Sequence, residues 1–366
     1  MREAWNGIMA GAGADALCNA YDWSELYIKA YVPTSDLFGW KLTNTDGAPI
    51  GILSFRYEPR RTPFALRRVL FAVDGSFDSD YLDFPAKRGF EAIVARAALD
   101  LLIAERDAEA VVLSCIPNNS ETLTILRGET ARRNLTRREI SVPCSIAPLP
   151  STFEDYLKQL KPRVRSKVRQ ALRLGEENKA VYKWCHEVGT IHEHLELLYQ
   201  LHGKRWNASG QPGSFIDVRR RHFYNTLAPA FLASNRLRFA RLEIEGQPVA
   251  YQIGALANNV YYQLQEGFDI NFSERRVATT LRALVIRDLI AEGISGYDFM
   301  AGESQHKSDW GAEARPCTTF AFPLPRIRAR AAYGARAVFD WWNQRSAAPS
   351  PSTSESHNEN AAGRES

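Results

Sequence analysis

Several ionisable side chains follow one short predicted strand late in the chain. The segment Tyr297-Asp-Phe-Met-Ala-Gly-Glu-Ser-Gln-His-Lys-Ser-Asp-Trp310 places Asp298, Glu303, His306 and Lys307 at the strand and just beyond it. So many titratable groups at a strand end indicate a site, and carboxylates and imidazoles there can accept a proton. Taken singly, each is also explained as a solvated loop residue or, for Asp298, as a cap.

A second segment indicates an anion site. Residues 267–281 lead from the end of a predicted strand, which Glu266 closes, into the first turn of a predicted helix. The free N–H groups and dipole of a helix start attract negative charge, and Arg275 and Arg276 add positive charge beside them. A plain loop with solvated arginines explains the same residues, and Glu266 is then an exposed strand end.

A basic helix is predicted upstream of both segments. Ser151-x-x-Glu154 is a capping box that opens one helix, and Pro162 ends it and begins a second that runs to about Glu177. The basic residues of this region are Lys158, Lys161, Arg163, Arg165, Lys167, Arg169 and Arg173. They form either a solvated basic face or a surface for phosphate groups, as in a lipid-linked sugar, the 3′-phosphate of coenzyme A or a tRNA acceptor end.

The candidate residues lie within a regular series of elements in the second half of the chain. Apolar periodicity and turn signals predict the series. It consists of strands at Leu237–Glu245, Val249–Leu256 and Val260–Glu266, a helix at Thr279–Ala291, a strand at Gly296–Met300 and a last strand at Cys317–Phe322. The candidates therefore occupy strand ends and one helix start.

The first half repeats the same order of elements. Its predicted elements are strands at Phe38–Thr43, Ile50–Tyr57 and Arg67–Val73, a helix at Phe90–Arg106, and strands at Val111–Cys115 and Arg137–Val142. Pro143, Pro148 and Pro150 separate the halves. Two tandem copies of one unit predict an α+β fold.

The overall composition is that of an ordinary globular protein. The 366 residues carry a net charge of +4, so nothing in the total charge requires nucleic acid or a membrane as a partner. No apolar run predicts a transmembrane helix or a secretion signal, which favours the cytoplasm. The five cysteines show no metal-binding spacing, so we expect no metal site and buried free thiols.

The ordered set of motifs resembles the cellulose-biosynthesis-type acetyltransferases of the GNAT superfamily, which are relatives of the Fem-type transferases. Its parts are an aromatic strand with Gly267-Phe-Asp, a helix, aromatic-Asp-Phe at Tyr297, Gly302-Glu and Lys307-x-x-Trp310, together with the basic segment Tyr156–Arg169, Leu201-His-Gly-Lys-Arg-Trp206 and Gly246-Gln-Pro-Val-Ala250. The similarity covers roughly residues 80–322 and is strongest after Ser151.

The resemblance implies two tandem GNAT-like lobes, each a mixed, mostly antiparallel sheet flanked by helices. The lobes are residues 1–147 and 148–325, followed by a helix at 326–345 and a disordered tail at 346–366. The Arg- and Ala-rich helix either packs on the body or contacts an anionic membrane surface. The resemblance also implies a peripheral contact with membrane-bound polysaccharide machinery. The implied donor is acetyl-CoA or another acyl-CoA, without a metal. The implied acceptor is an amine or hydroxyl of a sugar or cell-envelope precursor.

The resemblance also assigns roles to residues. The cofactor loop comprises Arg275, Arg276, Val277, Ala278, Thr279 and Thr280, with Val277 and Ala278 where the family usually has Pro and Gly. The candidate bases are Glu303, which matches the family's acidic position, then Glu266 and His306. The predicted acceptor-binding residues are Asp298, Lys307, Trp310, Arg205 and Trp206. Trp310 is explained as well by a role in closing the core.

Two other functions remain open at this level. A Fem-type transferase that uses aminoacyl-tRNA would bind RNA with the basic helix. A degenerate GNAT protein that only binds a ligand is compatible with Ala278, because a Cβ there can crowd the pyrophosphate of CoA. Apart from tRNA under the first alternative, no nucleic acid partner is expected.

Overall fold

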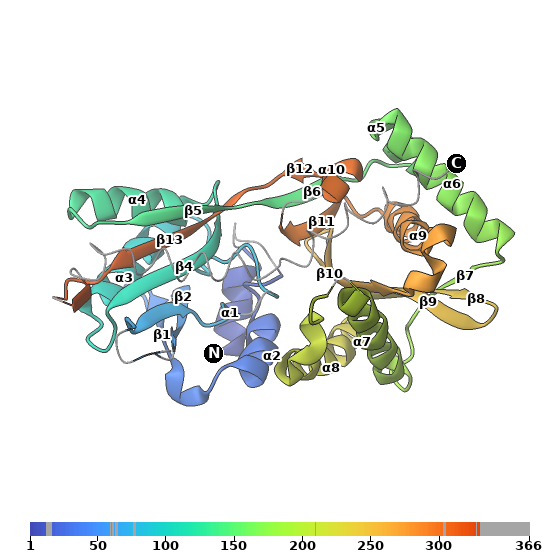
Figure 1. Cartoon of the computed structure of the whole chain (residues 1–366). Helices are drawn as coiled ribbons and strands as arrows, with labels where there is room; N and C mark the ends of the chain where they lie inside the picture. Colours follow the sequence, from blue (N-terminus) through green and yellow to red (C-terminus); the bar gives the residue numbers. More distant parts are fainter. Residues whose placement is uncertain are drawn as a thin grey trace. The chain divides into compact units, whose positions relative to one another are not determined.

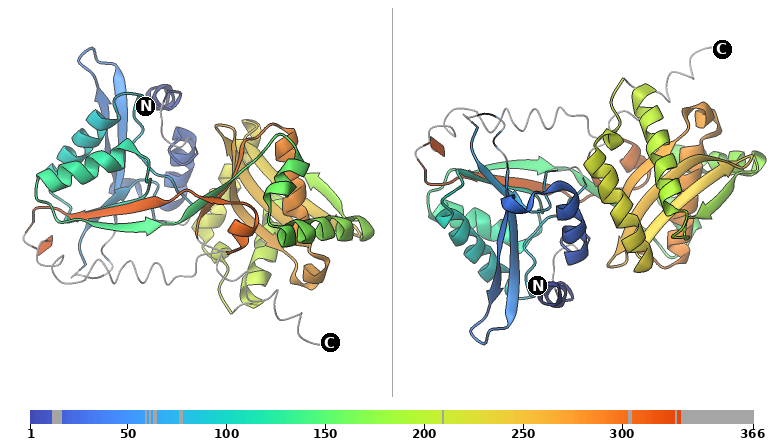
Figure 2. Two further views of the ribbon diagram at one scale, coloured as in Figure 1. Left: turned by 90° about the horizontal axis from the view of Figure 1, so that it is seen from above. Right: turned by 90° about the horizontal axis from the view of Figure 1, so that it is seen from below.

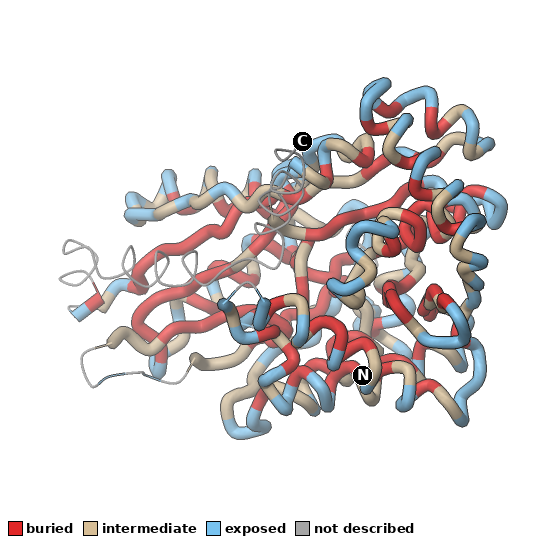
Figure 3. Tube along the Cα trace, turned by 45° about the vertical axis from the view of Figure 1, so that its right-hand side comes forward, coloured by how far each residue is buried: buried red, intermediate tan, exposed pale blue. Residues whose placement is uncertain are grey.

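The chain divides into two compact units, each with its own sheet. The computed structural model describes residues 1–11, 17–58, 60, 62, 65–75, 78–208, 210–302, 305–326 and 328–329. Unit 1 comprises residues 1–143 and the described residues from 315 onward, and unit 2 comprises residues 144–314. Buried strands form the centre of each unit, and the exposed residues gather on outer helices and loops (Figure 3).

Unit 1 is a six-stranded mixed sheet with four helices among its described residues (Figure 1). Its elements are α1 (Arg2–Met9), α2 (Tyr21–Tyr31), β1 (Leu37–Thr43), β2 (Pro49–Glu58), β3 (Arg68–Phe71), α3 (Glu91–Ala104), β4 (Ala110–Pro117), α4 (Glu121–Arg132), β5 (Arg138–Val142) and β13 (Cys317–Pro323). The strand order is β1-β2-β3-β4-β13-β5, and only β3 and β4 run parallel.

Unit 2 is a seven-stranded mixed sheet with order β12-β6-β11-β10-β9-β8-β7, in which only β10 and β11 are parallel. Its strands are β6 (Cys144–Pro148), β7 (Val181–Trp184), β8 (Leu237–Ile244), β9 (Gln247–Ala257), β10 (Val260–Phe268), β11 (Gly296–Ala301) and β12 (Glu313–Ala314). Its helices are α5 (Phe153–Gln159), α6 (Pro162–Glu177), α7 (Ile191–Ala208), α8 (Val218–Ala233), the 3₁₀ turn η3 (Ile270–Arg275), α9 (Val277–Ala291) and α10 (Gln305–Asp309).

Helices cover both faces of the sheet of unit 2. Figure 1 shows α9 on one face and α7 with α8 on the other. The α7 helix lies so close to β10 that a Cβ at Gly267 would stand 2.8 Å from the His202 backbone nitrogen. The α6 helix packs against α9 through its apolar face, and its first residue, Pro162, suits a helix start because its ring fixes φ and it has no N–H to satisfy.

The predicted α+β class with two mixed, mostly antiparallel sheets is confirmed, and each strand and helix predicted between residues 38 and 322 has a counterpart within a few residues. Two details differ. The cap of α5 lies one residue later than the predicted Ser151 and Glu154 pair: Thr152 accepts a hydrogen bond from the Asp155 N–H at 3.1 Å. The segment predicted as a loop before β5 contains α4, whose N-cap is Ser120.

The last strand corrects the predicted boundary of the second lobe at residue 325. Strand β13 leaves unit 2 and pairs between β4 and β5 of unit 1, with Phe320 opposite Leu113 and Glu139 (Figure 2). Its alternation predicted a strand, but a period of two carries no information on the partner strand. In unit 1 it buries Cys317, Phe320 and Phe322 completely.

Two predictions concern residues that the structure leaves largely undescribed. The predicted helix at 326–345 and the tail at 346–366 lie outside the described residues, apart from 326, 328 and 329.

All five cysteines are buried and free, as predicted. Within the described part of the chain, every helix falls short of the length and apolar character needed to cross a bilayer.

Candidate functional site

The two parallel strands of unit 2 diverge toward their carboxyl ends. They pair only at Val260–Tyr262 with Gly296–Asp298, although β10 continues to Phe268 and β11 to Ala301. The divergence coincides with irregular backbone: β10 shifts register against β9 at Leu264, and Met300 in β11 has a positive φ of 59°. The backbone groups of β10 beyond the three pairs are therefore not used between these two strands, and they can face a ligand.

The α9 helix begins beside this divergence with an uncapped first turn. The N-cap residue is Arg276, which takes the left-handed conformation with φ 53°, and its side chain makes no cap hydrogen bond. In the described chain, the N–H groups of Val277, Ala278 and Thr279 have no acceptor, whereas the N–H of Thr280 bonds to Arg276 O at 2.9 Å. Three free donors at the positive end of a 15-residue helix can hold a phosphate.

The structure divides the predicted cofactor loop into two groups of residues. Val277 is buried in the core of unit 2, and the Thr280 hydroxyl donates to Ala171 O of α6 at 2.9 Å, so these two side chains pack helices together. Arg275 is exposed and stacks over Phe272, while Ala278 and Thr279 are half-buried. The strained position is Arg276, not Ala278, so the replacement of Gly by Ala at 278 creates no positive-φ strain.

A buried polar network links β10, α9 and α10. The Arg282 side chain, only 3% exposed, donates to the Glu266 carboxylate and to the His306 imidazole Nε2. Gln263 donates to the same carboxylate at 2.9 Å, and Arg205 of α7 lies 3.5 Å from it. Two of the three predicted bases, Glu266 and His306, are therefore joined through one guanidinium.

The His306 imidazole is held in its neutral form. Burial lowers its pKa well below the ordinary value, and the positive charge of Arg282 lowers it further. Because Nε2 accepts from Arg282, the ring proton sits on Nδ1. A neutral imidazole beside a carboxylate can relay a proton, although the neighbouring cation opposes formation of the imidazolium.

Three predicted acceptor-binding residues stabilise the end of β11. The Lys307 ammonium donates to Phe299 O, Met300 O and Ala301 O at 2.9, 3.3 and 2.8 Å. Asp298 is fully buried and accepts from the Met300 N–H at 2.7 Å, which supports the positive φ there. Trp310 is buried in the core, and its carbonyl accepts from the Tyr156 hydroxyl at 2.7 Å.

The other two predicted acceptor-binding residues differ in their placement. Arg205 stacks over the Phe268 ring at 4.9 Å and faces Glu266, so it belongs to the polar network. Trp206 is buried and donates from its indole to His202 Nε2 at 2.9 Å. Burial, with a smaller effect of Arg220, lowers the pKa of His202 to about 3. Glu303, the first predicted base, lies outside the described residues.

Sequence reasoning missed Arg282, the residue at the centre of the network. A signal was present: Arg282 stands between Leu281 and Ala283 and shares a helix face with Val285, Ile286 and Leu289, all buried. A charged residue in an apolar stripe is buried only when it is paired, so its partner had to be a carboxylate or another acceptor. The identity of that partner required the fold.

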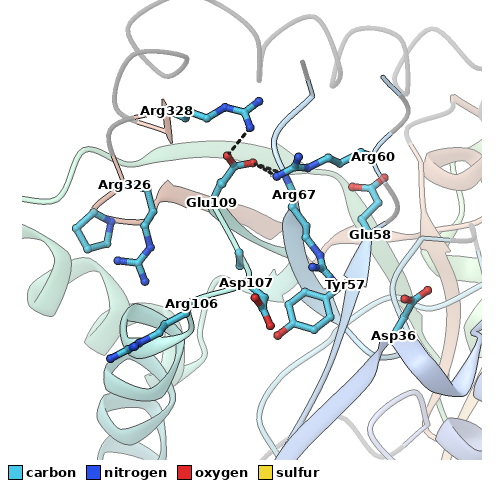
Figure 4. A pocket seen from close by; sticks show the side chains of 12 residues that line it. Asp36, Tyr57, Glu58, Arg60, Arg67, Arg106, Asp107, Glu109, Arg326 and Arg328 are labelled. Carbon is cyan, nitrogen blue, oxygen red and sulfur yellow. Dashed lines mark hydrogen bonds and ion pairs between the residues drawn. The ribbon is translucent and has the colours of Figure 1, made fainter. Parts of the chain in front are cut away.

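Unit 1 contains a separate hollow of ≈ 940 Å³ near the amino ends of β3 and β4 (Figure 4). Glu109 at its wall accepts from the Arg60 guanidinium at 3.1 Å and from the Arg67 N–H at 2.8 Å, and Arg328 lies 3.5 Å away. This carboxylate is therefore neutralised, and none of the predicted site residues lies there. In the same unit the buried thiols of Cys115 and Cys317 lie within 4.8 Å of each other.

Comparison with known families gives one match, over the segment that carries the network. Residues 162–308 match the family model described as an acetyltransferase (GNAT) domain. The matched segment lies within unit 2. It includes Glu266, Arg282 and His306 and the start of α9. No curated protein matches the sequence, and the cellulose-biosynthesis subfamily stays a prediction.

Solved structures share the fold over almost the entire chain. A structure named FemX aligns with 91% of this chain and 98% of its own, at 13% identity and a TM-score of 0.64. L-PGS from Bacillus licheniformis aligns over 93% and 96%, at 10% identity and a TM-score of 0.55. The C-terminal domain of a putative lysylphosphatidylglycerol synthetase from Agrobacterium fabrum aligns over 92% and 95%, at 12% identity and a TM-score of 0.52. At such identities the likeness concerns the fold alone, which in this chain consists of two α+β units.

Proposed function

We propose that the protein is an N- or O-acyltransferase that uses an acyl-CoA, with acetyl-CoA as the expected donor. The acceptor is an amine or hydroxyl of a sugar or cell-envelope precursor. The observation that carries the proposal is the diverging parallel pair β10 and β11 with the uncapped start of α9 beside it. The GNAT family match over the same segment supports it.

The donor site rests on the first turn of α9. The three free N–H groups of residues 277–279 suit the pyrophosphate of CoA, and Arg275 and Arg276 add positive charge next to them. Ala278, where the family usually has Gly, takes an unstrained helical backbone in the first turn of α9. When bound, the acyl-CoA supplies the thioester, and the unpaired backbone of β10 lies where it can donate to the thioester oxygen.

The acceptor must lose a proton as it attacks. The Glu266 carboxylate lies on β10 beyond the point where β10 and β11 diverge, and Arg282 and Arg205 orient it. We assign Glu266 as the proton acceptor, held in place by Arg282, which also donates to the neutral His306. Glu303 remains the alternative base because of its family match. Glu266→Gln and Glu303→Gln, compared in acetyl transfer to a panel of amino sugars, distinguish the two.

Ligand-dependent stability tests the donor site without knowledge of the acceptor. Saturating CoA or acetyl-CoA should raise the midpoint of thermal unfolding, because a ligand at about 100 times its Kd stabilises the native state by about 2.7 kcal/mol. Ala278→Glu places a carboxylate among the three free N–H groups and should abolish the shift. Ala278→Gln has the same size without the charge and should keep most of it. Equal loss in both variants would count against an electrostatic anion site.

A second function has one observation in its favour. The FemX structure matches nearly the whole chain, including unit 1, which favours a Fem-type transferase that takes its acyl group from aminoacyl-tRNA. Under this alternative the wild type gives no thermal shift with CoA but binds tRNA saturably. A chain that responds to neither, and whose Glu266→Gln and Glu303→Gln variants behave as wild type in cells, would instead be a non-catalytic binding protein.

A further inference from the structure

A groove on the outer side of unit 2 combines arginines with apolar side chains. It is lined by residues of α5 and α6, two helices that Figure 1 labels, and has a volume of ≈ 740 Å³. Its lining residues are Phe153, Glu154, Leu157, Pro162, Arg165, Ser166, Arg169, Leu172 and Arg173. None of them belongs to the site at β10 and β11, so the groove is a separate feature of the GNAT domain.

The three arginines form one stripe along α6. Arg165, Arg169 and Arg173 are spaced by four residues, which places them one above another on a helix. The opposite face of the same helix is apolar: Val164, Val168, Ala171 and Gly175 are buried where α6 packs against α9. Packing on α9 therefore fixes the direction of the stripe, which faces away from the body of the unit.

The groove has an excess of positive charge. Glu154 is the one carboxylate among its lining residues, and it pairs with Arg169 at 3.0 Å in an exposed contact. Arg165 donates to the Leu160 carbonyl at 3.3 Å, which leaves its charge uncompensated. Arg173 has no partner in the described chain. Three cations against one anion leave two positive charges facing solvent.

Apolar side chains line the same groove. Leu157 is buried, while Phe153 and Leu172 are half-buried and contribute part of their surface to the groove. A surface that serves only to keep a protein soluble has no need of leucine and phenylalanine beneath an arginine row. The combination of basic rim and apolar floor suits a ligand that has phosphate and hydrocarbon side by side.

We propose that the α5–α6 groove docks the protein on an anionic phospholipid surface. The lipid phosphates contact Arg165, Arg169 and Arg173, and the upper part of the acyl region contacts Phe153 and Leu172, which lie over the buried Leu157. Lipid is favoured over RNA because the floor is mainly aliphatic, whereas proteins that bind single-stranded RNA present aromatic rings on which bases stack. The docking is independent of the proposed acyl transfer.

Vesicle binding tests this proposal with the full chain. Wild type should co-float with phosphatidylcholine vesicles that contain a quarter phosphatidylglycerol and should not co-float with pure phosphatidylcholine. The triple variant Arg165→Gln, Arg169→Gln, Arg173→Gln should bind on the order of 100-fold more weakly, because each basic side chain at an anionic surface contributes about 1 kcal/mol. The positions are exposed or half-buried, so the thermal midpoint should stay near that of wild type.

A matched triple variant in unit 1 separates a local site from total charge. Lys41→Gln, Lys87→Gln, Arg88→Gln removes the same three charges from exposed positions and should change vesicle binding by less than about two-fold. Equal losses in both triples, or no binding of wild type to the anionic vesicles, overturn the proposal. So does polyuridine binding that the α6 triple abolishes in the absence of vesicle binding. Both triples should retain the thermal shift with CoA, so this test can fail independently of the proposed acyl transfer.

Discussion

Each unit contains one parallel strand pair joined by a helix, and the two pairs differ at the point where a ligand would bind. In unit 1 the connection from β3 to α3 is long, and Leu82 within it donates its N–H to Cys115 O of β4 at 3.0 Å. In unit 2 the connection from β10 to α9 is the short turn η3. In the described part of this connection, no backbone N–H donates to a carbonyl of β11 as Leu82 does to β4. The first unit fills the space beside its parallel pair with its own chain.

The two helix starts differ in the same sense. In unit 1 the Glu91 carboxylate lies in the first turn of α3 and accepts from the Gly89 N–H at 2.6 Å. The first turn of α9 contains no acidic residue and follows two arginines. Neither helix has a side-chain cap, but the Glu91 carboxylate places a negative charge at the positive end of α3, whereas the positive end of α9 has no carboxylate in its first turn. Under the proposed function, the difference favours a donor site in unit 2 and a structural role for unit 1.

The largest expected effect comes from breaking the buried pair of unit 2. Arg282→Met leaves the Glu266 carboxylate buried without its main partner, which should cost about 4 kcal/mol of unfolding free energy. It should also weaken acyl transfer. Urea unfolding measures the first effect, and Glu266→Gln in the same chain should restore part of the loss. Arg68→Met breaks the Arg68–Glu58 pair of unit 1, 2.8 Å long, and should destabilise without changing the CoA shift.

Removing part of the filling segment of unit 1 tests whether it is only structural. Leu82 is 1% exposed, so Leu82→Ala should cost about 3 kcal/mol through lost burial and the resulting cavity. Urea unfolding with hydrogen exchange should place the loss in unit 1. The Kd for CoA should stay as in wild type; a weaker Kd would show that unit 1 takes part in donor binding.

The loss of stability between pH 7 and pH 5 should be a property of unit 2, because residues 1–143 contain no histidine. Burial lowers the pKa of His202 to about 3, and that of His306 is lowered too. A histidine in the unfolded chain has a pKa of about 6.5. Below that pH the unfolded chain binds protons at these imidazoles and the folded chain does not, so the free energy of unfolding falls as the pH drops toward 3. His202 alone should cost about 2 kcal/mol between pH 7 and pH 5.

Urea unfolding of His202→Gln at the two pH values checks this contribution. The variant should show a flatter pH dependence, since the amide oxygen can still accept from Trp206. His222→Gln, at an exposed position of α8, should retain the wild-type dependence. An unchanged slope in His202→Gln would mean that His202 is not held neutral in the folded chain.

The smallest effect compares one glycine of each unit. A Cβ at Gly175 of α6 would stand 2.9 Å from Thr280 Cγ2 of α9, so Gly175→Ala should destabilise by about 1 kcal/mol. A Cβ at Gly128 of α4 meets nothing within 4 Å, so Gly128→Ala should stabilise by about 0.5 kcal/mol. Thermal unfolding of the two variants should give shifts of opposite sign. Two shifts of the same sign would refute close α6–α9 packing.

The sequence predicted which segments form strands and helices, because period and turn residues are local. It also brought Glu266 and His306 into one candidate site through their places at strand ends. It could not predict that Arg282 joins them, since the contact spans 16 and 24 residues of chain. Nor could it predict that Lys307 would bind backbone carbonyls rather than a ligand: an ammonium suits both, and only the fold decides which acceptors are near.

Strand β13 has a consequence for synthesis on the ribosome. Strand β5 pairs with β13 alone, and β13 follows the entire second unit. Until residue 323 has left the exit tunnel, β4 presents an open edge and β5 has no partner, while residues 144–314 form a continuous stretch that can fold first. The amino-terminal unit, although made first, is thus completed last. Any product truncated before residue 317 would expose the unpaired edge of β4 to the cell's quality control.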